Sequence, residues 1–276
     1  RSTECLWQQV RPERSWAGWP QEVMELLQRP ADFRRRTSQA DLQAELELWA
    51  GAHQIPLAKK GTAGEDSYFL GSHCLGVADG VGEWRSEWGI DAREFTDELM
   101  EGCKSYLQNS EHRVNGPLSR HAQAAMHEGH STTRSFGSST ALVAVLGRRN
   151  QLGVANLGDS GLCLLRREEV CQGMRMVFRT TAQQTGFNCP RQMGHIPGAQ
   201  DYAALLARGK DRLVDCLKKQ PTAQKWDEAK DAQLNDVPVQ HGDLVIVCSD
   251  GVFDNLWDKE ICELAAHAAG PLEAEL

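Results

Sequence analysis

The sequence predicts an α+β fold in which helices cover a sandwich of antiparallel sheets. Strand-like segments follow one another closely over residues 139–166, which leaves no room for the crossover helices that parallel strands require. Helical patterns flank the strands in groups rather than alternating with them one by one. The chain has 276 residues, of which 41% are hydrophobic, and this is enough for one large domain or two small ones.

Residues 1–58 are predicted to form a helical N-terminal extension. A proline at the start suits the first turn of a helix over residues 20–28. A second helix is predicted over residues 38–49, because Ser38 has a capping partner in Asp41 and hydrophobic residues then recur on one face. The extension either packs on the main domain or docks to a partner, and the sequence favours neither.

The main domain is predicted over residues 59–276. A polar segment over residues 182–230, with one helix over 202–217, is predicted to be an insertion or flap over one face. A Ser/Thr/Gly-rich loop is expected over 129–137, and a hairpin turn over 158–161. The expected strands cover residues 67–70, 75–78, 139–146, 151–156, 162–166, 174–180, 237–239 and 244–248, and the other expected helices cover 91–107, 118–126 and 258–267.

Charge and cysteine usage limit the partners and the compartment. The formal net charge is −8 and the pI about 5.6, which argues against a general binder of nucleic acid or anionic membranes, since both require a basic face. No apolar run approaches the roughly 18 residues of a membrane span. Nine cysteines are scattered without a Cys-x-x-Cys pair, which favours free thiols in a reducing compartment. We therefore expect an intracellular protein, in the cytoplasm in the first place. Because the chain starts at Arg1, any targeting segment is expected to have been removed.

Two apolar strands are each followed by an Asp-Gly pair, and this repetition is the strongest functional signal in the sequence. Asp79-Gly80 follows the strand over 75–78, and Asp250-Gly251 comes after the strand over 244–248. A carboxylate at the end of a packed strand, followed by a glycine that lets the backbone come close, suits a metal ion. Such an ion can take a side-chain oxygen from the aspartate and the carbonyl oxygen of the glycine together. A single Asp-Gly pair would more simply mark a turn.

Several more acids adjoin predicted strands, and together they indicate a centre for two metal ions. If these side chains converged without cations, their charges would repel one another, whereas around Mg²⁺ or Mn²⁺ they are hard oxygen ligands of the right type. Two such ions about 3.5–4 Å apart can activate a water molecule and bind phosphoryl oxygens, which supports in-line attack on a phosphate ester without a side-chain nucleophile. The acids are Glu65, Asp66, Asp79, Asp159, Asp250 and Asp254.

Five motifs that include these acids occur in the order found in one enzyme family. They are Gly64-Glu65-Asp66, Val77-Ala78-Asp79-Gly80-Val81-Gly82, Gly137-Ser138-Ser139-Thr140-Ala141, Ala155-Asn156-Leu157-Gly158-Asp159-Ser160 and Cys248-Ser249-Asp250-Gly251-Val252-Phe253-Asp254-Asn255. From about residue 59 to its end, the chain resembles the metal-dependent protein Ser/Thr phosphatases of type 2C, the PPM family. This resemblance implies a four-layer α-β-β-α sandwich with two metal ions, Mn²⁺ or Mg²⁺, in a cleft at one end of the sheets, and phosphorylated proteins as substrates. The Asp-Gly-Val-Gly-x-Trp sequence is most similar to the branch that includes mitochondrial and plastid members, which adds these organelles to the expected locations.

Carried over residue by residue, the resemblance assigns the metal ligands. Asp79 would bridge both ions. Glu65 and the carbonyl group of Gly80 would complete the protein ligands of one ion, and Asp250 would bind the other. Asp79 and Asp250 are therefore the expected catalytic residues.

The resemblance also assigns roles around the two ions. Asp159 and Asp254 match positions where some family members hold a third, looser ion. Asp66 would lie behind the ligands and orient water. The family's phosphate-binding arginine usually precedes the Glu-Asp pair, where this chain has only Lys59 or Lys60 nearby. A lysine would act there as a point charge without the fork of an arginine.

Two departures from the family pattern leave a second function open. Many members have a histidine after the first Asp-Gly, proposed to protonate the leaving group, whereas this chain has Val81. The family also ends with a strand that carries another metal-binding aspartate, which is missing after Asp254-Asn255, and truncation is the expected reason. The favoured function is hydrolysis of phosphoserine and phosphothreonine by in-line attack of a metal-bridging hydroxide. The alternative is a pseudophosphatase, a binding or regulatory module with the same fold.

Two other kinds of site fit the sequence poorly. Gly158-Asp159-Ser160-Gly161 imitates the nucleophile motif of chymotrypsin-like proteases, but His73 is in a poor context for the histidine of such a triad. An EF-hand loop around Asp79 fails because Leu75 and Val77 occupy positions that require ligands.

Overall fold

The structure, a computed structural model, describes residues 46–55, 64–110, 116–168, 173–219 and 226–269. The predicted helix over 20–28 and most of the one over 38–49 lie outside these ranges. The end of the second helix was predicted wrongly, since residues 46–55 form neither helix nor strand. Leu48 donates its backbone N–H to the carbonyl oxygen of Ser72 at 2.7 Å. Leu46 and Leu48 both pack between the sheets, as residues two apart do in an extended chain.

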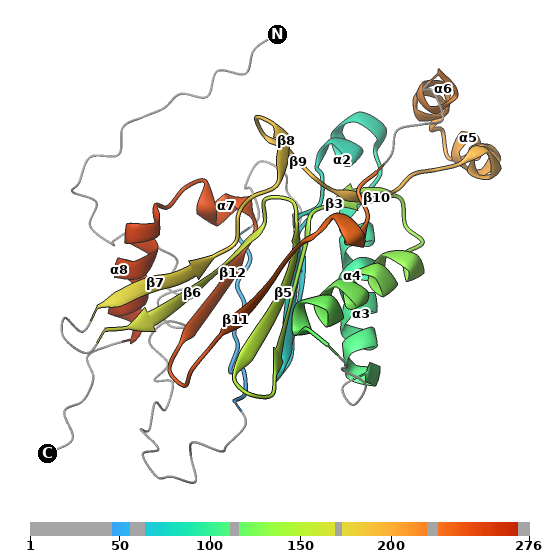
Figure 1. The fold of residues 1–276 in the computed structure, drawn as a ribbon. Coiled ribbons are helices and arrows are strands. Elements are labelled where there is room, and N and C mark those ends of the chain that lie inside the picture. Colours follow the sequence, from blue (N-terminus) through green and yellow to red (C-terminus); the bar gives the residue numbers. More distant parts are fainter. Residues whose placement is uncertain (1–45, 56–63, 111–115, 169–172, 220–225, 270–276) are drawn as a thin grey trace, which may run out of the picture.

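Two main antiparallel sheets face each other in the described part of the chain, one of five strands and one of three (Figure 1). Their strands pair in the antiparallel sense that the close spacing predicted. The order in the larger sheet is β1 (Ser67–Leu70), β2 (Cys74–Ala78), β4 (Ala141–Gly147), β5 (Gln151–Leu157) and β11 (Gln233–Pro238). The order in the smaller sheet is β12 (Leu244–Cys248), β6 (Gly161–Arg167) and β7 (Met174–Arg179).

Strand β4 shows why these residues form the centre of a sandwich. Its side chains alternate between two hydrophobic clusters, following the two-residue period of a strand. Val143 and Val145 belong to the cluster under the helices, whereas Leu142 and Leu146 belong to the cluster between the sheets. None of the four is more than 7% exposed. Burial on both faces therefore explains the continuous apolar run in this part of the sequence.

Helices cover the outer faces of both sheets (Figure 1). α3 (Ala92–Ser110) and α4 (Leu118–Thr132) pack on the five-stranded sheet in a cluster that includes the buried Phe95. α8 (Asp258–Ala269) packs against the three-stranded sheet through residues such as Ile261. The layers follow the order helix, sheet, sheet, helix, so the predicted four-layer α-β-β-α sandwich is confirmed. α4 is longer than predicted and takes up the first part of the expected loop over 129–137.

The connection between β5 and β6 differs from its prediction. A hairpin turn over 158–161 would pair the two strands, but β5 pairs with β4 and β11, and β6 pairs with β12 and β7. The turn instead carries the chain from one sheet to the other, because the apolar side chains of β5 and β6 pack face to face between the sheets. Its backbone bonds elsewhere: Gly158 accepts a hydrogen bond from the N–H of Gln183 at 2.8 Å.

The predicted flap contains more regular structure than expected. Its single expected helix over 202–217 is two helices, α5 (Tyr202–Ala207) and α6 (Asp211–Lys219). Gly209 lies between them with a φ of +71°, a conformation that ends a helix and that glycine adopts without strain. In Figure 1 the two helices project from the body of the sandwich. The segment also adds three short strands, β8 (Gln184–Gly186), β9 (Cys189–Pro190) and β10 (Met193–His195), the last of which pairs with β3 (Gly137–Ser139).

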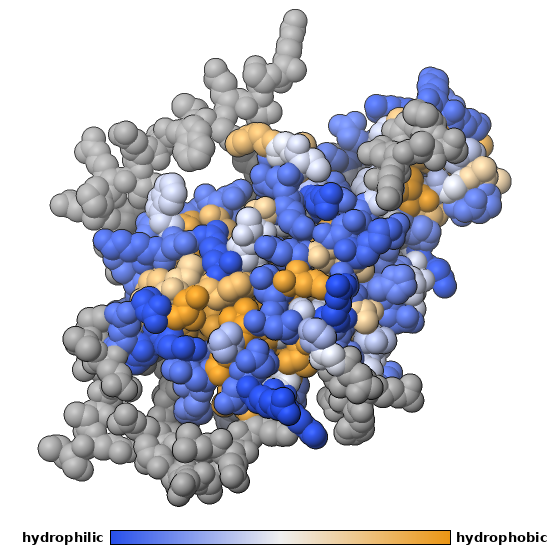
Figure 2. Space-filling model, viewed as in Figure 1, coloured by the Kyte–Doolittle hydropathy of each residue, from blue (hydrophilic) through white to orange (hydrophobic). Residues whose placement is uncertain are grey.

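One face of the molecule carries hydrophobic side chains near its middle, in the region where β12 lies (Figure 2). The residues of this strand are only half-buried, unlike those of β4. None of the helices in the described ranges combines the length and hydrophobicity that a membrane crossing requires.

Candidate metal centre

The predicted acidic residues come from both sheets and meet at one end of the sandwich. Ser67, at the start of β1, pairs with Ala78, at the end of β2, so Asp66 and Asp79 lie next to each other at the same edge. Asp250 follows β12 of the opposite sheet and begins α7 (Asp250–Phe253). The carboxyl group of Asp79 lies close enough to those of Asp66 and Asp250 for both to affect its pKa. Strand ends therefore bring together three carboxyl groups that are distant in the sequence.

This crowding changes the proton affinity of the carboxyl groups. Burial, followed by the charges of Asp66 and Asp250, raises the pKa of Asp79 to about 9. Burial also raises the pKa of Asp66, although hydrogen bonds with Asp79 and Ser249 oppose the rise. The pKa of Asp254 is raised by burial and by the charge of Asp250. Without a cation, the cluster therefore keeps a proton at neutral pH because adjacent carboxylates cannot all ionise.

The backbone of Gly80 lies directly against Glu65. A Cβ atom at position 80 would come within 2.6 Å of the carbonyl oxygen of Glu65 and 3.1 Å of Cγ2 of Thr96. Thr96 donates its hydroxyl hydrogen to the same carbonyl oxygen at 2.8 Å. Only glycine therefore fits at this position, and it keeps the Asp79-Gly80 turn beside the Glu65-Asp66 pair.

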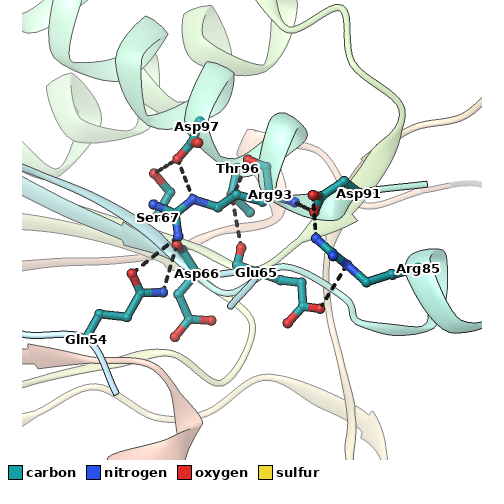
Figure 3. Close-up of polar contacts among 9 residues, drawn as sticks. All are labelled: Gln54, Glu65, Asp66, Ser67, Arg85, Asp91, Arg93, Thr96 and Asp97. Atoms are coloured by element: carbon teal, nitrogen blue, oxygen red, sulfur yellow. Dashed lines mark hydrogen bonds and ion pairs between the residues drawn. The ribbon is translucent and has the colours of Figure 1, made fainter. Parts of the chain in front are cut away.

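Polar residues outside the predicted set hold the aspartates in place. The backbone N–H of Asp79 donates to Oγ1 of Thr140 at 3.2 Å, and the N–H of Thr140 donates to the carbonyl oxygen of Asp79 at 3.0 Å. The hydroxyl of Ser249 donates to a carboxylate oxygen of Asp66 at 3.2 Å. Gln54 donates to the backbone oxygen of Asp66 at 3.2 Å (Figure 3). Thr140 and Ser249 belong to the motifs noted in the sequence, but nothing in their pattern indicated these positioning roles.

A basic residue that the sequence did not indicate lies beside this centre. Arg85 is in α2 (Glu83–Trp88), a short helix that is not among the elements expected from the sequence. Its Nε is 3.7 Å from Oε1 of Glu65, and its Nη2 forms an ion pair with Asp91 (Figure 3). The indole N–H of Trp84 donates to Oγ of Ser138 at 2.7 Å and anchors the helix. The one sequence signal that could have drawn attention to Arg85 is its position a few residues after the first Asp-Gly pair, Asp79-Gly80.

The remaining predicted site residues are placed less closely. Asp159 is buried in the β5–β6 connection, where its carboxylate accepts a hydrogen bond from Nε2 of Gln184 at 2.9 Å. Asp254 follows α7 and lies near enough to Asp250 for the charge of Asp250 to raise its pKa. Lys59 and Lys60 lie outside the described residues.

The chemistry of the acidic cluster fits a hard divalent cation. Within the described ranges, no three acidic, histidine or cysteine side chains are already arranged as a group of metal ligands, although Asp79 lies close to Asp66 and Asp250. The donors that meet here are all oxygens, and a cation would replace the proton that the cluster otherwise retains. Oxygen-only sets of this kind suit Mg²⁺ and Mn²⁺.

The comparisons with known proteins agree with this arrangement. The family model described as "Protein phosphatase 2C" matches residues 58–272, so the chain belongs to the protein phosphatase 2C family. Among similar proteins, "Probable protein phosphatase 2C 26" of Arabidopsis thaliana is 31% identical over 240 residues, covering 84% of this chain and 67% of the relative. "Protein phosphatase PTC7 homolog" of Xenopus laevis is 32% identical over 213 residues, covering 75% of this chain and 63% of the relative. The chain thus spans about two thirds of these relatives, and only 22% of a longer one.

A solved structure supports the fold. The X-ray structure of the photosystem II phosphatase PBCP superposes with a TM-score of 0.58 at 26% sequence identity, over 79% of this chain and 75% of that protein. Its similarity extends over most of the described sandwich and agrees with the α+β fold predicted from the sequence.

Proposed function

We propose that the chain is a metal-dependent protein serine/threonine phosphatase that hydrolyses phosphoserine and phosphothreonine in proteins. The observation that carries this proposal is the meeting of Asp66, Asp79 and Asp250 at one end of the sandwich, where their mutual repulsion favours divalent cations. Membership of the protein phosphatase 2C family supports the same reaction.

In this proposal the chain supplies oxygen ligands for two ions, Mn²⁺ or Mg²⁺. When bound, such ions supply a nucleophile made from water at neutral pH and positive charge for the phosphoryl oxygens. The proposed ligands are Asp79, shared by both ions, with Glu65 and the Gly80 carbonyl on one side and Asp250 on the other. Asp66 would orient water beside them, and Asp159 and Asp254 would serve a third, weaker ion.

The chain does not need a serine nucleophile for this reaction. Ser160 is 1% exposed, and its hydroxyl is bonded to that of Thr140 at 2.7 Å. A buried, hydrogen-bonded hydroxyl of this kind cannot reach a protein substrate, so the serine-protease interpretation of this motif fails. With Val81 in place of the family's histidine, we assign protonation of the leaving group to water rather than to a side chain.

We further propose that the segment over 182–230 helps to dock protein substrates on the domain that covers residues 59–276. Leu205, Leu213 and Val214 of its two helices pack against the end of α2, and Nζ of Lys210 donates to the carbonyl oxygen of Gly89 at 2.8 Å. Between residues 202 and 219 there are five basic and two acidic residues. This excess of positive charge suits a phosphorylated, and therefore acidic, protein segment.

Placement within the family and the cell also belongs to this proposal. The Asp-Gly-Val-Gly-x-Trp motif favours the branch that lacks the histidine, and two of the similar proteins are the photosystem II phosphatase PBCP and a PTC7 homologue. Seven cysteines in the described part of the chain are free thiols, which favours a reducing intracellular compartment such as the cytoplasm, mitochondrion or plastid.

A phosphopeptide assay tests the proposed function. We expect phosphate release with Mn²⁺, none with EDTA, and almost none from Asp79→Ala under either condition. Ser160→Ala is the matched control, since it alters a neighbouring buried polar residue without removing an oxygen ligand. Full activity in EDTA, or a trapped phosphoenzyme, would contradict the mechanism. A folded chain that binds Mn²⁺ but releases no phosphate would instead indicate the pseudophosphatase.

A further inference from the structure

Arg85 brings positive charge to the edge of the acidic centre. Nε of Arg85 forms an ion pair with Oε1 of Glu65, a proposed metal ligand, at a distance of 3.7 Å. The other carboxylate on this guanidinium, that of Asp91, contacts Nη2 (Figure 3). The Glu65 carboxylate is 5% exposed, whereas the Arg85 side chain is 33% exposed. Nε of Arg85 and Oε1 of Glu65 are both buried and make no hydrogen bond among the described residues, so the exposed part of the arginine side chain lies elsewhere.

We propose that Arg85 binds the phosphoryl group of the substrate and holds it against the metal centre, an inference that rests on the proposed phosphatase function. A guanidinium presents five N–H donors in a planar fork that matches two phosphoryl oxygens. The 3.7 Å separation from Glu65 is longer than a hydrogen bond, so this contact leaves Nε able to turn to a better acceptor. When cations bind Glu65, its charge is shared with them, and its attraction for Arg85 weakens.

The surroundings of α2 keep this guanidinium at a fixed place. At one end, Trp84 is bonded to Ser138 of β3, and Val81 donates its backbone N–H to the carbonyl oxygen of Ser138 at 3.0 Å. At the other end, Trp88 and Ile90 pack against the flap helices. Asp91 holds Nη2 from the side. A helix fixed at both ends positions its arginine with little loss of side-chain freedom on binding, which favours tight binding of an anion.

The competing explanation is a purely structural ion pair that holds Glu65 in place. The two roles predict different measurements. A structural role affects Mn²⁺ affinity and stability in the absence of any phosphate. A phosphate-binding role changes the affinity for phosphate and the KM, and it leaves the metal affinity nearly unchanged.

The experiment measures the binding of inorganic phosphate by calorimetry to the full chain loaded with Mn²⁺. For Arg85→Gln we expect a loss of about 10- to 100-fold in phosphate affinity, as for one charge-assisted contact. We expect a similar rise in KM for a phosphopeptide and a change in Mn²⁺ affinity of less than about threefold. Arg85→Lys keeps the charge without the fork, so its phosphate affinity should lie between those of the wild type and Arg85→Gln.

Arg93→Gln is the matched control, because Arg93 also pairs with an aspartate, Asp97 at 2.9 Å, close to the same strands (Figure 3). It should bind phosphate as the wild type does. Equal phosphate affinity in the wild type and both Arg85 variants, while the wild type hydrolyses the phosphopeptide, would overturn the role of Arg85 alone. A fall in Mn²⁺ affinity as large as the fall in phosphate affinity would also overturn it, in favour of the structural pair. A wild type without metal-dependent hydrolysis would overturn the proposed function and this inference with it.

Discussion

Asp79→Asn should stabilise the metal-free protein while it removes activity. In the metal-free chain, burial and the charges of Asp66 and Asp250 raise the pKa of Asp79 from 3.8 to about 9. The folded state thus binds a proton that the unfolded state releases at neutral pH. Below about pH 4 both states hold this proton, and stability is at its full value. As the pH rises toward 9, that stability is lost.

The expected size follows from the same shift. Between the two pKa values, the free energy of unfolding of the wild type should fall by at most about 1.4 kcal/mol per pH unit because of this group. This gives up to about 4 kcal/mol between pH 5 and pH 8. It is an upper limit because Asp79 is only partly buried and water screens part of the repulsion. Asparagine carries no charge at any of these pH values, so the variant lacks this loss.

Urea denaturation in EDTA at pH 5, 6.5 and 8 would measure the effect. The stability of Asp79→Asn minus that of the wild type should grow steadily with pH. At saturating Mn²⁺ the order should reverse, because bound metal stabilises the wild type and the variant lacks the shared ligand. Parallel pH profiles of the two proteins in EDTA would refute the reasoning, since they would mean that no carboxyl group is crowded at position 79.

Three further predictions concern other parts of the chain. Ser160→Ala should cost about 1 kcal/mol of unfolding free energy, through the lost bond to Thr140, and keep most of the activity; a loss as large as that of Asp79→Ala would contradict the metal mechanism. Arg166→Ala should cost about 3 kcal/mol in urea denaturation, because it leaves the buried carboxylate of Asp243 without its two 2.7 Å bonds, and unchanged stability would disprove this. Replacing exposed basic residues in and between the flap helices by glutamine should raise KM for a phosphoprotein more than for an aryl phosphate, and equal effects would count against docking. These residues are Arg208, Arg212 and Lys219.

The layers of the fold could be predicted because each depends on a local pattern. The continuous apolar run of β4 and the amphipathic stripe of α3 can each be recognised from the residues of that element alone. The path between layers could not be predicted in the same way. Whether β5 and β6 pair edge to edge or pack face to face depends on partners far away in the sequence, β11 and β12.

The candidate site shows the same division. Asp79 and Asp250 could be recognised because each ends an apolar strand and precedes a glycine, and the structure brings them together. Arg85 could not, because it has no motif of its own and reaches Glu65 only through the placement of a six-residue helix. Thr140 was missed for a similar reason, since its contact with Asp79 joins two neighbouring strands.

The distribution of the acids over both sheets makes the proposed metal ions a link between them. Asp79 follows a strand of the larger sheet and Asp250 follows a strand of the smaller one, so ions bound to both would fasten the two halves of the sandwich at one end. Amide protons of β12 and β6 should then exchange with solvent more slowly when Mn²⁺ is present. Conversely, a substitution that creates a cavity between the sheets, far from the acids, should lower the affinity for the metal ions. Metal binding and the rigidity of the sandwich would therefore be thermodynamically linked, so that a change in either one changes the other.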